Sequence, residues 1–365
     1  MTEKKHTVAI VGLGFGKAHI RAFQVNGCEV VAVCQRDGEK ARAMAERYGI
    51  AQSYDSWEEM IEKTRPEIVS ITTPPHNHRA IAERAFEAGA HVLCEKPLTV
   101  SADDALAMAE AARISGLIGM TSFNMRFVPA MARFHEMVEG GYIGDHWYGD
   151  ALFSIPRWVN PETPSSWRMD KQIAGVGALG DVGAHMIDLI NWNMGRITRV
   201  AAASGIAHKD KKKAGSDRPM DTDDFTAFVG ELESGAIIGA SLSRVARGLD
   251  GGQDMTIHGS KATLHYHLQR QGPLWYMGRL EAGEGPSLQP VELDVTFPDS
   301  AGEGEPLEVQ GQTSVASVVK HMLGAIEGGD RHPAPTFEDG ARAQAVLDAL
   351  VEASGTDRWV NVRQV

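Results

Sequence analysis

From residue 7 to residue 124, short apolar runs alternate with longer stretches whose apolar positions recur at helical spacing. The short runs predict strands at Thr7–Val11, Glu29–Cys34, Ile68–Thr72, His91–Cys94 and Ile118–Thr121. The stretches between them predict helices at Lys17–Val25, Glu39–Tyr48, Ser56–Lys63, His78–Glu87 and Ala102–Ser115. Strands that alternate with helices in this way are typical of βαβ units. The sequence therefore predicts a doubly wound parallel sheet over this segment.

After residue 124 the pattern changes to runs with period-two alternation and fewer helices. Helices are expected at Pro129–Glu139, Gly177–Asn193 and Glu338–Ser354, and strands at Arg199–Ser204, Asp224–Glu233, Ala236–Val245, Asp254–His258 and Ala262–His267. These elements predict an α/β domain with a large, open, mainly antiparallel sheet. At 365 residues the chain is long enough for two domains, which we expect at 1–124 and 125–365.

Composition narrows the function classes. The net charge of −12 and the pI near 5.6 argue against a nucleic-acid or anionic-membrane surface, because both partners need a basic protein surface. No stretch approaches the ~20 uninterrupted apolar residues of a membrane span, and the first residues contain no apolar signal segment. Three cysteines without a C-x-x-C pair indicate neither a disulfide framework nor a zinc site. We therefore expect a cytoplasmic protein with no metal and with no nucleic-acid or membrane partner.

A glycine-rich turn follows the first predicted strand. Gly12, Gly14 and Gly16 surround Phe15, and a strict G-x-G-x-x-G count places Lys17 at the third glycine position. Such a turn lets backbone N–H groups approach a pyrophosphate at the start of the next helix. Taken alone, the same residues also suit a plain tight turn.

The second predicted strand leads into Gln35 and Arg36, about 20 residues beyond the turn, where a dinucleotide-binding sheet reads the adenosine ribose. An acidic residue at this place would accept hydrogen bonds from both ribose hydroxyls and repel a 2′-phosphate. Gln35 lacks that charge, and Arg36 is a fixed cation able to grip phosphate. These residues favour NADP(H), and NAD(H) stays possible if Arg36 only stacks on the adenine.

Lys96 follows the apolar run His91–Cys94 and Glu95, and Pro97 forces a turn directly after it. A lysine at a strand end of the same sheet is expected to face the cofactor. Farther along, residues 177–188 read G-A-L-G-D-V-G-A-H-M-I-D and contain Asp181 and His185. Together, the glycine turn, Lys96 and this pair resemble the Gfo/Idh/MocA family of nicotinamide-dependent sugar and polyol oxidoreductases. The resemblance covers nearly the whole chain.

This resemblance implies a Rossmann fold for residues 1–124 and a substrate-binding and oligomerisation domain for residues 125–365. It also implies that the loop after the third strand borders the nicotinamide ribose and the diphosphate. The cofactor-binding set implied by the resemblance comprises Gly12, Gly14, Phe15, Gly16, Gln35, Arg36, Thr72, Thr73, Pro74, His78, Glu95, Lys96 and Asn124. Glu95 is expected to orient Lys96 or to contact the nicotinamide ribose.

Asp181, His185 and Asp188 fall at i, i+4 and i+7, so a continuous helix would carry them on one face. Oxidation of a secondary alcohol needs a base for the hydroxyl proton and a cation that stabilises the developing alkoxide. His185 suits the first task and Lys96 the second, although the formal base is open between the two. Asp181 would fix the imidazole tautomer. Each residue alone also suits a structural role, as a surface cation, a core histidine or a helix N-terminal acid. Because Lys96, Asp181 and His185 all stand at positions that match the family's motifs, together they predict a catalytic set.

Two arginines and two tryptophans lie close together in the sequence: Arg157, Trp158, Trp167 and Arg168. Aromatic faces that stack on sugar C–H bonds, beside arginines that hold hydroxyls or a phosphate, predict a substrate-binding role. Packing between domains explains the same residues nearly as well. With Lys96, Asp181 and His185, they make up the predicted substrate site.

The leading hypothesis is an NADP(H)- or NAD(H)-dependent dehydrogenase or reductase that acts on a sugar, inositol or related polyol. One alternative is a glycoside hydrolase or lyase whose tightly bound NAD is regenerated within each turnover. Another is a non-catalytic, nucleotide-sensing regulator, which would have no need of Lys96, Asp181 and His185 together. Because an open sheet leaves one apolar face bare, we expect a homodimer or homotetramer through the C-terminal sheet.

Overall fold

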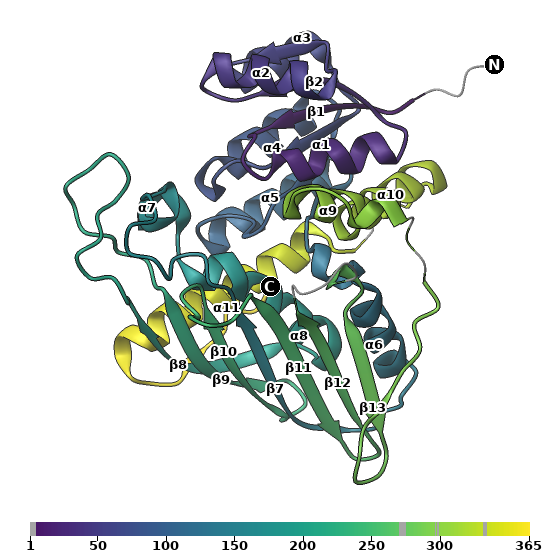
Figure 1. Ribbon diagram of the computed structural model, residues 1–365, viewed down its shortest axis with the longest axis vertical. Helices are drawn as coiled ribbons and strands as arrows, with labels where there is room; N and C mark the ends of the chain where they lie inside the picture. The colour runs from purple at the N-terminus through teal and green to yellow at the C-terminus, as the bar shows by residue number, and fades with distance from the viewer. Residues whose placement is uncertain (1–4, 270–274, 296, 298, 331–333) are drawn as a thin grey trace. The chain divides into compact units, whose positions relative to one another are not determined.

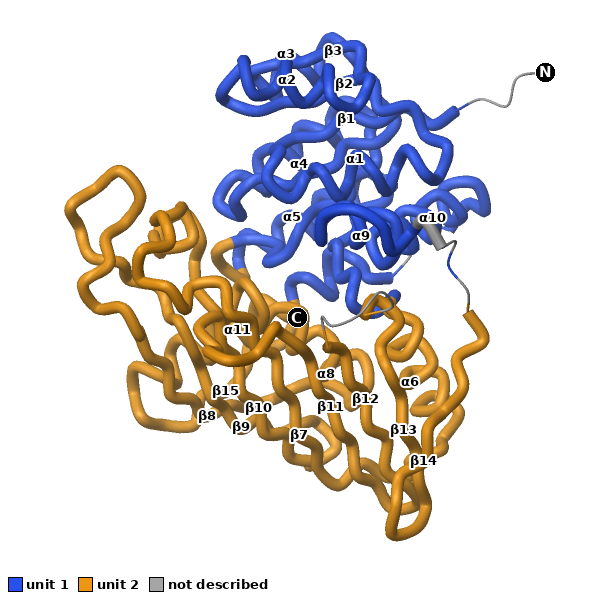
Figure 2. The backbone as a smooth tube through the Cα atoms, viewed as in Figure 1, with its two compact units in different colours: residues 1–99, 103–127, 297–341 blue, residues 100–102, 128–296, 342–365 orange. Residues whose placement is uncertain are grey.

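The computed structural model describes residues 5–269, 275–295, 297, 299–330 and 334–365. The chain forms two compact units, which are coloured separately in Figure 2. Unit 1 contains residues 1–99, 103–127 and 297–341, and unit 2 contains residues 100–102, 128–296 and 342–365. This division differs from the expected boundary after residue 124 chiefly in one segment, because residues 297–341 lie in unit 1.

Among the described residues, a six-stranded parallel sheet forms the centre of unit 1 (Figure 1). Its strands are β1 (Thr7–Val11), β2 (Glu29–Cys34), β3 (Gln52–Tyr54), β4 (Ile68–Ile71), β5 (His91–Cys94) and β6 (Gly119–Thr121). They lie in the order β3-β2-β1-β4-β5-β6, so the winding reverses between β1 and β4. In sheets of this kind, ligands bind outside the carboxyl ends of the strands at the reversal. The doubly wound parallel sheet predicted from the sequence is confirmed.

Local capping explains where several helices of unit 1 begin. These helices are α1 (Gly16–Val25), α2 (Gly38–Tyr48), α3 (Trp57–Thr64), α4 (His78–Glu87), α5 (Ala102–Ser115), α9 (Pro306–Gln312) and α10 (Ser314–Gly328), with 3₁₀ turns at Pro75–Asn77, Asn124–Phe127 and Asp299–Gly302. The hydroxyl of Ser56 accepts the Glu59 N–H at 3.2 Å and so caps α3. Helices α9 and α10 were not predicted from the sequence, and both pack against α1. Val315 and Met322 of α10 join Phe23 of α1 in one apolar core.

Within the described ranges, unit 2 is built on a nine-stranded sheet with the order β14-β13-β12-β11-β7-β10-β9-β8-β15. Its strands are β7 (His146–Ser154), β8 (Ile197–Gly205), β9 (Phe225–Leu232), β10 (Ile237–Ser243), β11 (Gly252–Gly259), β12 (Thr263–Gln269), β13 (Arg279–Gly283), β14 (Gln289–Pro290) and β15 (Val360–Asn361). β7 and β10 pair in parallel, and the other neighbours pair antiparallel. The large, mainly antiparallel sheet is therefore confirmed, with the unpredicted strand β7 at its centre.

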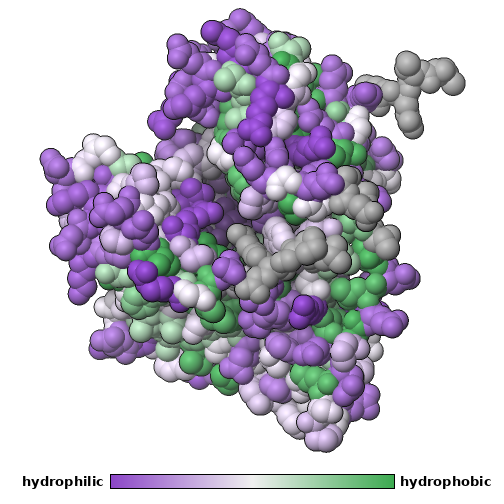
Figure 3. Space-filling model, in the orientation of Figure 1, coloured by the Kyte–Doolittle hydropathy of each residue, from purple (hydrophilic) through white to green (hydrophobic). Residues whose placement is uncertain are grey.

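Helices cover one face of this sheet and leave the other exposed. The remaining helices of the chain are α6 (Pro129–Glu139), α7 (Lys171–Ala174), α8 (Ala184–Met194) and α11 (Phe337–Thr356), of which α11 begins in unit 1, with a π-helical turn, η4, at Leu179–Gly183 and 3₁₀ turns at Trp167–Met169 and Trp275–Met277. α6 packs on β12 and β13, and α8 packs on β7. On the opposite face, Tyr148, Phe225, Val229 and Ile237 are between 38% and 48% exposed. In the view of Figure 3, hydrophobic surface is spread over unit 2 in several patches.

The stretch Lys171–Met194, which contains α7, η4 and α8, is long and apolar enough to cross a membrane by length and composition. It is the one such stretch in the part of the chain that the structure describes. Within unit 2, however, 83% of its most apolar window is buried. A core helix has this degree of burial, and its apolar character is explained by packing.

Candidate active site

The chain turns sharply after β1 at Gly12. Gly12 has a φ of +90°, and a Cβ on it would lie 2.7 Å from the carbonyl carbon of Thr72. The Thr72 hydroxyl donates to the Gly12 carbonyl oxygen at 2.6 Å, and the Thr72 N–H donates to the Val11 carbonyl oxygen at 2.8 Å. The positive φ and the close backbone approach together require glycine at this position. The turn after β1 is thereby fixed to the residue that follows β4.

Gly14 and Gly16 complete the turn. A Cβ on Gly14 would have no described protein atom within 4 Å, whereas a Cβ on Gly16 would lie 3.0 Å from the Thr72 hydroxyl oxygen. α1 begins at Gly16 without a side-chain cap, so its first N–H groups and its positive dipole end lie at the turn. Next to Thr72, the hydroxyl oxygen of Thr73 is buried with no hydrogen-bond partner among the described residues. An open glycine at a helix start and an orphaned hydroxyl fit the diphosphate of a dinucleotide.

Gly14→Val is expected to raise the dissociation constant for NADP⁺ by about 10-fold or more, because the new side chain occupies the space that a diphosphate needs. The fold should tolerate it, since no described protein atom lies within 4 Å of the new Cβ. Gly12→Ala is the matched comparison: its backbone clash should lower the thermal midpoint by on the order of 5 °C. Isothermal titration calorimetry and thermal unfolding measure the two effects. Unchanged affinity in Gly14→Val would exclude this turn as the diphosphate site.

At the end of β2, Gln35 donates its N–H to the Tyr54 carbonyl oxygen at 3.1 Å, and Arg36 is exposed. The neighbouring Asp37 caps α2: its carboxylate accepts the Lys40 N–H at 3.2 Å and pairs with the Lys40 Nζ at 2.8 Å. The bonds from Lys40 lower the pKa of Asp37. The acid at this strand end is thus engaged within its own helix, and Arg36 is the charged group that extends from the strand into solvent.

The loop after β4 is fastened by His78, the first residue of α4. The Nδ1 of His78 lies 2.9 Å from the Leu98 carbonyl oxygen, and its Nε2 lies 2.8 Å from the Thr73 carbonyl oxygen. Burial lowers the pKa of His78, although both carbonyl contacts act in the opposite direction. Pro74 lies between the two fastened parts of this loop. Because both ring nitrogens face backbone carbonyls, His78 holds the loop in place rather than presenting a free ring nitrogen to a ligand.

Lys96 directly follows Glu95, whose carboxylate is buried beyond the end of β5. His19 of α1 lies between Glu95 and Ser70: its Nε2 is 3.0 Å from Glu95 Oε1, and its Nδ1 is 2.8 Å from Ser70 Oγ. Burial alone would raise the pKa of Glu95, but the bond and charge of His19, the charge of Lys96 and a bond from Ser122 bring it below its ordinary value. The second carboxylate oxygen accepts the Lys96 N–H at 3.3 Å. The buried imidazole–carboxylate pair therefore fixes the backbone that carries Lys96.

His19, Ser70 and Ser122 are missing from the predicted site. One signal for them is present in the sequence: Ser70 is a polar residue inside the otherwise apolar run Ile68–Ile71, which is buried at every position. A buried hydroxyl in such a strand requires a partner. Asn124, by contrast, was predicted to touch the cofactor, and its amide donates to the Ser314 hydroxyl of α10 at 2.9 Å.

The segment that carries Asp181 and His185 is not one regular α-helix. It begins with the π-helical turn η4 and continues as α8 from Ala184, so the junction separates the two residues. The expectation that Asp181, His185 and Asp188 share one face of a regular helix is corrected accordingly, because the wider turn rotates Asp181 relative to α8. His185 and Asp188 are 5% and 2% exposed. The centre of the His185 ring lies 6.3 Å from the centre of the Phe153 ring on β7.

Asp223 fixes the start of this segment. Its carboxylate oxygens accept the Gly177 N–H at 2.7 Å and the Leu179 N–H at 2.9 Å, and its backbone carbonyl accepts the Ala178 N–H at 2.8 Å. Gly177 approaches so closely that a Cβ on it would overlap the Asp223 carbonyl oxygen. Burial raises the pKa of Asp223, and the backbone bonds and Arg244 oppose that rise. This cap, which holds the predicted catalytic segment, was not predicted from the sequence.

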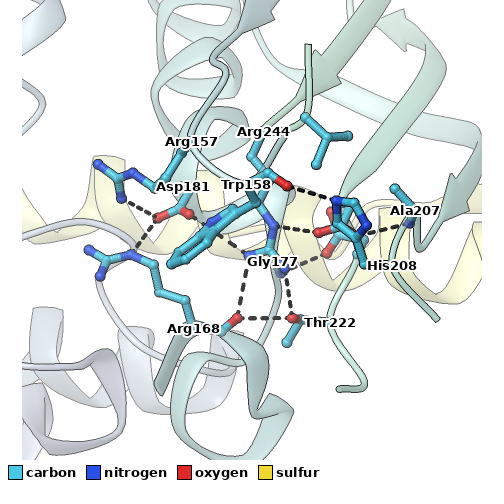
Figure 4. Close-up of polar contacts among 12 residues, drawn as sticks. Arg157, Trp158, Arg168, Gly177, Asp181, Ala207, His208, Thr222 and Arg244 are labelled. Atoms are coloured by element: carbon cyan, nitrogen blue, oxygen red, sulfur yellow. Dashed lines mark hydrogen bonds and ion pairs between the residues drawn. The ribbon is translucent and has the colours of Figure 1, made fainter. Parts of the chain in front are cut away.

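Arg157, Arg168 and Arg244 surround Asp181 (Figure 4). The Nε of Arg168 donates to Asp181 Oδ1 at 2.8 Å, and a terminal nitrogen of Arg157 lies 3.8 Å from the same oxygen. A terminal nitrogen of Arg244 lies 3.9 Å from Asp181 Oδ2. Arg244 is fully buried, and its Nε donates to Asp224 Oδ1 at 2.9 Å. The structure thus brings Arg157, Arg168 and Asp181 together, and it adds Arg244 and Asp224, which the sequence analysis missed.

Trp167 and Trp158 lie in different surroundings. The Arg168 guanidinium carbon is 4.3 Å from the centre of the Trp167 ring, so Trp167 supports the arginine cluster by a cation–π contact. Trp158 is 6% exposed and packs with Met169 and Met220 in a small apolar core. Trp158 therefore serves chiefly to pack this apolar core.

Each unit gathers one part of the predicted site. Unit 1 holds the glycine turn, the strand ends and Lys96, whereas unit 2 holds Asp181, His185 and the arginines. No group of three or more His, Cys, Asp or Glu side chains within the described ranges is arranged to hold a metal ion. Unit 1 offers an anion site beside a lysine, and unit 2 offers an imidazole, a carboxylate and guanidinium groups. These groups suit the binding and oxidation of a polar alcohol.

Comparison with known proteins agrees with this chemistry. Residues 6–123 match the model of an oxidoreductase family with an NAD-binding Rossmann fold, and residues 131–265 match the GFO/IDH/MocA C-terminal domain. The chain is 28% identical to levoglucosan dehydrogenase of Pseudarthrobacter phenanthrenivorans over 98% of each chain. It is 26% identical to D-apiose dehydrogenase of Paraburkholderia graminis, covering 100% of this chain and 92% of that one.

Solved structures extend the likeness over the whole fold. A levoglucosan dehydrogenase in complex with NADH and levoglucosan has a TM-score of 0.88 at 27% identity, covering 99% of this chain and 100% of that one. An oxidoreductase domain protein from Kribbella flavida has a TM-score of 0.88 at 30% identity, with the same coverage. Both family domains and nearly full-length relatives are thus matched, and the chain belongs to the GFO/IDH/MocA family of NAD(P)-dependent oxidoreductases.

Proposed function

We propose that the protein is a dehydrogenase or reductase that moves a hydride between NADP(H), or NAD(H), and a secondary alcohol or ketone of a sugar, inositol or related polyol. The observation that carries this proposal is the buried His19–Glu95 pair. It connects α1, the helix that follows the glycine turn, to the residue before Lys96. A dinucleotide held at that turn and the Lys96 ammonium group would therefore belong to one rigid framework. The sugar and polyol class rests on the named relatives.

The proposed catalytic set is Lys96, Asp181 and His185. When bound, the nicotinamide supplies the carbon that accepts or donates the hydride. The Lys96 ammonium group stabilises negative charge on the substrate oxygen. His185 takes or returns the hydroxyl proton, and Asp181 orients the imidazole and stabilises its charged form. Lys96 and His185 remain the two candidates for the formal base. Arg157, Trp158, Trp167 and Arg168 are proposed to bind or support the substrate.

The cofactor preference is proposed to be NADP(H), and Arg36→Ala tests it. Loss of the guanidinium should raise the dissociation constant for NADPH by about 10-fold or more, because a charge-assisted contact to the 2′-phosphate is lost. NADH carries no 2′-phosphate, so its dissociation constant should change by less than about threefold. Fluorescence titration of both reduced cofactors measures the two constants. Equal losses for NADPH and NADH would contradict the preference.

A homodimer or homotetramer through the open face of the unit 2 sheet is also proposed, because exposed apolar side chains gather on that face. Val229→Glu places a charge among them and should yield a monomer in size-exclusion chromatography with light scattering. Val25→Glu is the matched control: Val25, on α1, is 48% exposed, compared with 40% for Val229, and should leave the mass unchanged. If both variants keep the wild-type mass, or if the wild type is a monomer, the proposed interface is wrong.

We further propose that residues 1–124 bind the cofactor, that residues 125–365 bind the substrate and form the oligomer, and that the enzyme works in the cytoplasm without a nucleic-acid or membrane partner. The function is tested by absorbance of reduced nicotinamide with NAD⁺ and, separately, NADP⁺ against a panel of inositols, aldoses, sugar acids and sugar phosphates. Sustained growth with one compound supports the dehydrogenase and identifies its cofactor. No growth with any compound, and cofactor already bound to the purified protein, would favour a hydrolase or lyase that regenerates its NAD.

A further inference from the structure

The charges around Asp181 do not balance locally. The charge of Arg244 is compensated by Asp224: its Nε donates to the Asp224 carboxylate at 2.9 Å, and a terminal nitrogen donates to the Thr222 hydroxyl at 3.0 Å. Arg168 uses its Nε for Asp181 at 2.8 Å. Arg157 is the remaining cation, and its nearest carboxylate oxygen, on Asp181, is 3.8 Å away. That separation is too long for a hydrogen bond.

The surroundings of Arg157 disfavour its charge. The part of Arg157 that is buried lowers its pKa, and the charges of Arg168 and Arg244 lower it further, while Asp181 acts in the opposite direction; 44% of the side chain is exposed, so water screens part of these effects. Because Arg244 pairs with Asp224, Asp181 is left to compensate both Arg157 and Arg168, and it already accepts a hydrogen bond from Arg168. Two guanidinium groups beside this one carboxylate leave one positive charge in surplus, which water screens in the free protein and which an anion would neutralise.

The free ends of Arg157 and Arg168 are oriented alike. In Figure 4 their terminal nitrogens lie on the same side of Asp181 and point away from the buried Arg244. The two side chains are 44% and 29% exposed, so both reach solvent. Trp167 packs against the Arg168 guanidinium at 4.3 Å and restricts its movement. Two planar guanidinium groups that approach the same oxygen, Asp181 Oδ1, at 2.8 Å and 3.8 Å suit the oxygens of a carboxylate or a phosphate.

We infer that Arg157 and Arg168 bind an anionic substituent of the substrate, which is therefore a sugar or polyol derivative that carries a carboxylate or a phosphate. This inference rests on the proposed function, because it names the substrate class of the same site. A neutral sugar would leave the surplus charge of Arg157 with only water as its partner. An anionic substituent compensates that charge and orients the substrate hydroxyl relative to Asp181 and His185.

The test is isothermal titration calorimetry of the protein with saturating reduced cofactor, which binds alongside an alcohol without oxidising it, against matched triplets. Each triplet contains a neutral aldose, its uronate and its terminal phosphate, in the gluco, galacto, manno and xylo series. At least one anionic member should bind about 10-fold or more tightly than its neutral parent, since a charge-assisted hydrogen bond contributes about that factor. A preference for the uronate identifies a carboxylate, and a preference for the phosphate ester identifies a phosphate.

Arg157→Gln then assigns the preference to this cluster. The ratio of the neutral to the anionic dissociation constant should fall by about 10-fold in Arg157→Gln. Lys209→Gln is the matched control: it removes one charge from an exposed lysine of the loop after β8 and should keep the wild-type ratio. The inference is overturned if no anionic member binds more tightly than its parent, including the case in which none binds. It is also overturned if Arg157→Gln keeps the ratio.

Failure of this inference is distinguishable from failure of the proposed function. If neutral aldoses are oxidised with net formation of reduced cofactor and anions give no advantage, the dehydrogenase stands and the anionic substrate class is wrong. If an anionic member binds selectively but no compound produces reduced cofactor, the arginine cluster stands and the dehydrogenase is wrong.

Discussion

Lys96→Ala is expected to lower kcat by about 10²- to 10³-fold, because a positioned cation that stabilises developing charge on the substrate oxygen contributes on that order. The variant should still bind the cofactor, since the glycine turn and the His19–Glu95 pair are unchanged. Stopped-flow absorbance gives the rate of cofactor reduction, and fluorescence titration gives the cofactor dissociation constant.

Lys63→Ala provides the control for this variant. Lys63 is an exposed lysine of the same unit that pairs with Glu59, and its removal should leave kcat unchanged. Lys96→Arg keeps the charge with a different shape and should recover part of the lost rate if electrostatic stabilisation is the main role. A near-wild-type kcat in Lys96→Ala would remove Lys96 from the mechanism.

His185→Ala should lower kcat by about 10²- to 10⁴-fold, the range attributed to general acid–base catalysis by a positioned side chain. The variant should also lose the acidic limb of its pH–rate profile in the direction of alcohol oxidation, because the neutral imidazole that accepts the proton is absent. Steady-state kinetics at a series of pH values measures both effects. A structural role would lower stability and leave the shape of the profile intact.

His135→Ala is a suitable comparison for the loss of an imidazole from unit 2. His135 stacks on Trp192 at 3.7 Å between ring centres and lies outside the proposed catalytic set. Its removal should lower the thermal midpoint while the pH–rate profile keeps its limbs. If His185→Ala behaves in the same way as His135→Ala, the proton-transfer role of His185 is wrong.

Hydrophobic pattern predicted unit 1 well because its central strands are short apolar runs covered on both faces. β4 and β5 are buried at every residue, so their runs are apolar apart from Ser70 and His91. β3 has only three residues and partial burial, and its pattern gave no signal. β7 was also missed: its first half is largely exposed and its second half largely buried, so no single periodicity describes it.

The position of α10 could not be predicted from local pattern. The helix itself was missed, although Val315, Val318 and Met322 lie on one buried side of it. Its partner is α1, almost 300 positions earlier in the chain, and Asn26, the residue that caps the end of α1, donates to the Ala316 carbonyl oxygen at 3.0 Å. Periodicity identifies a buried face and leaves its partner undetermined.

The candidate site also divides into residues that lie in local sequence motifs and contacts between segments that are distant in the chain. Lys96 and the Asp181–His185 pair could be proposed as candidates from the sequence, because each lies in a local motif of about a dozen residues that the family resemblance covers. The groups that hold them come from distant positions: His19 reaches Glu95, Asp223 reaches Gly177, and Asp224 reaches Arg244. These pairs form only when the sheets assemble, so no spacing of residues along the chain predicts them.

The central claim is net hydride transfer from substrate to a cofactor that is then released. It is tested most directly with an excess of oxidised cofactor over protein and a substrate that carries deuterium at its carbinol carbons. Absorbance quantifies reduced nicotinamide, and mass spectrometry detects its deuterium. The account predicts many equivalents of reduced cofactor per protein, each carrying one deuterium. Conversion of the substrate with no more reduced cofactor than protein, or with reduced cofactor free of deuterium, would contradict it.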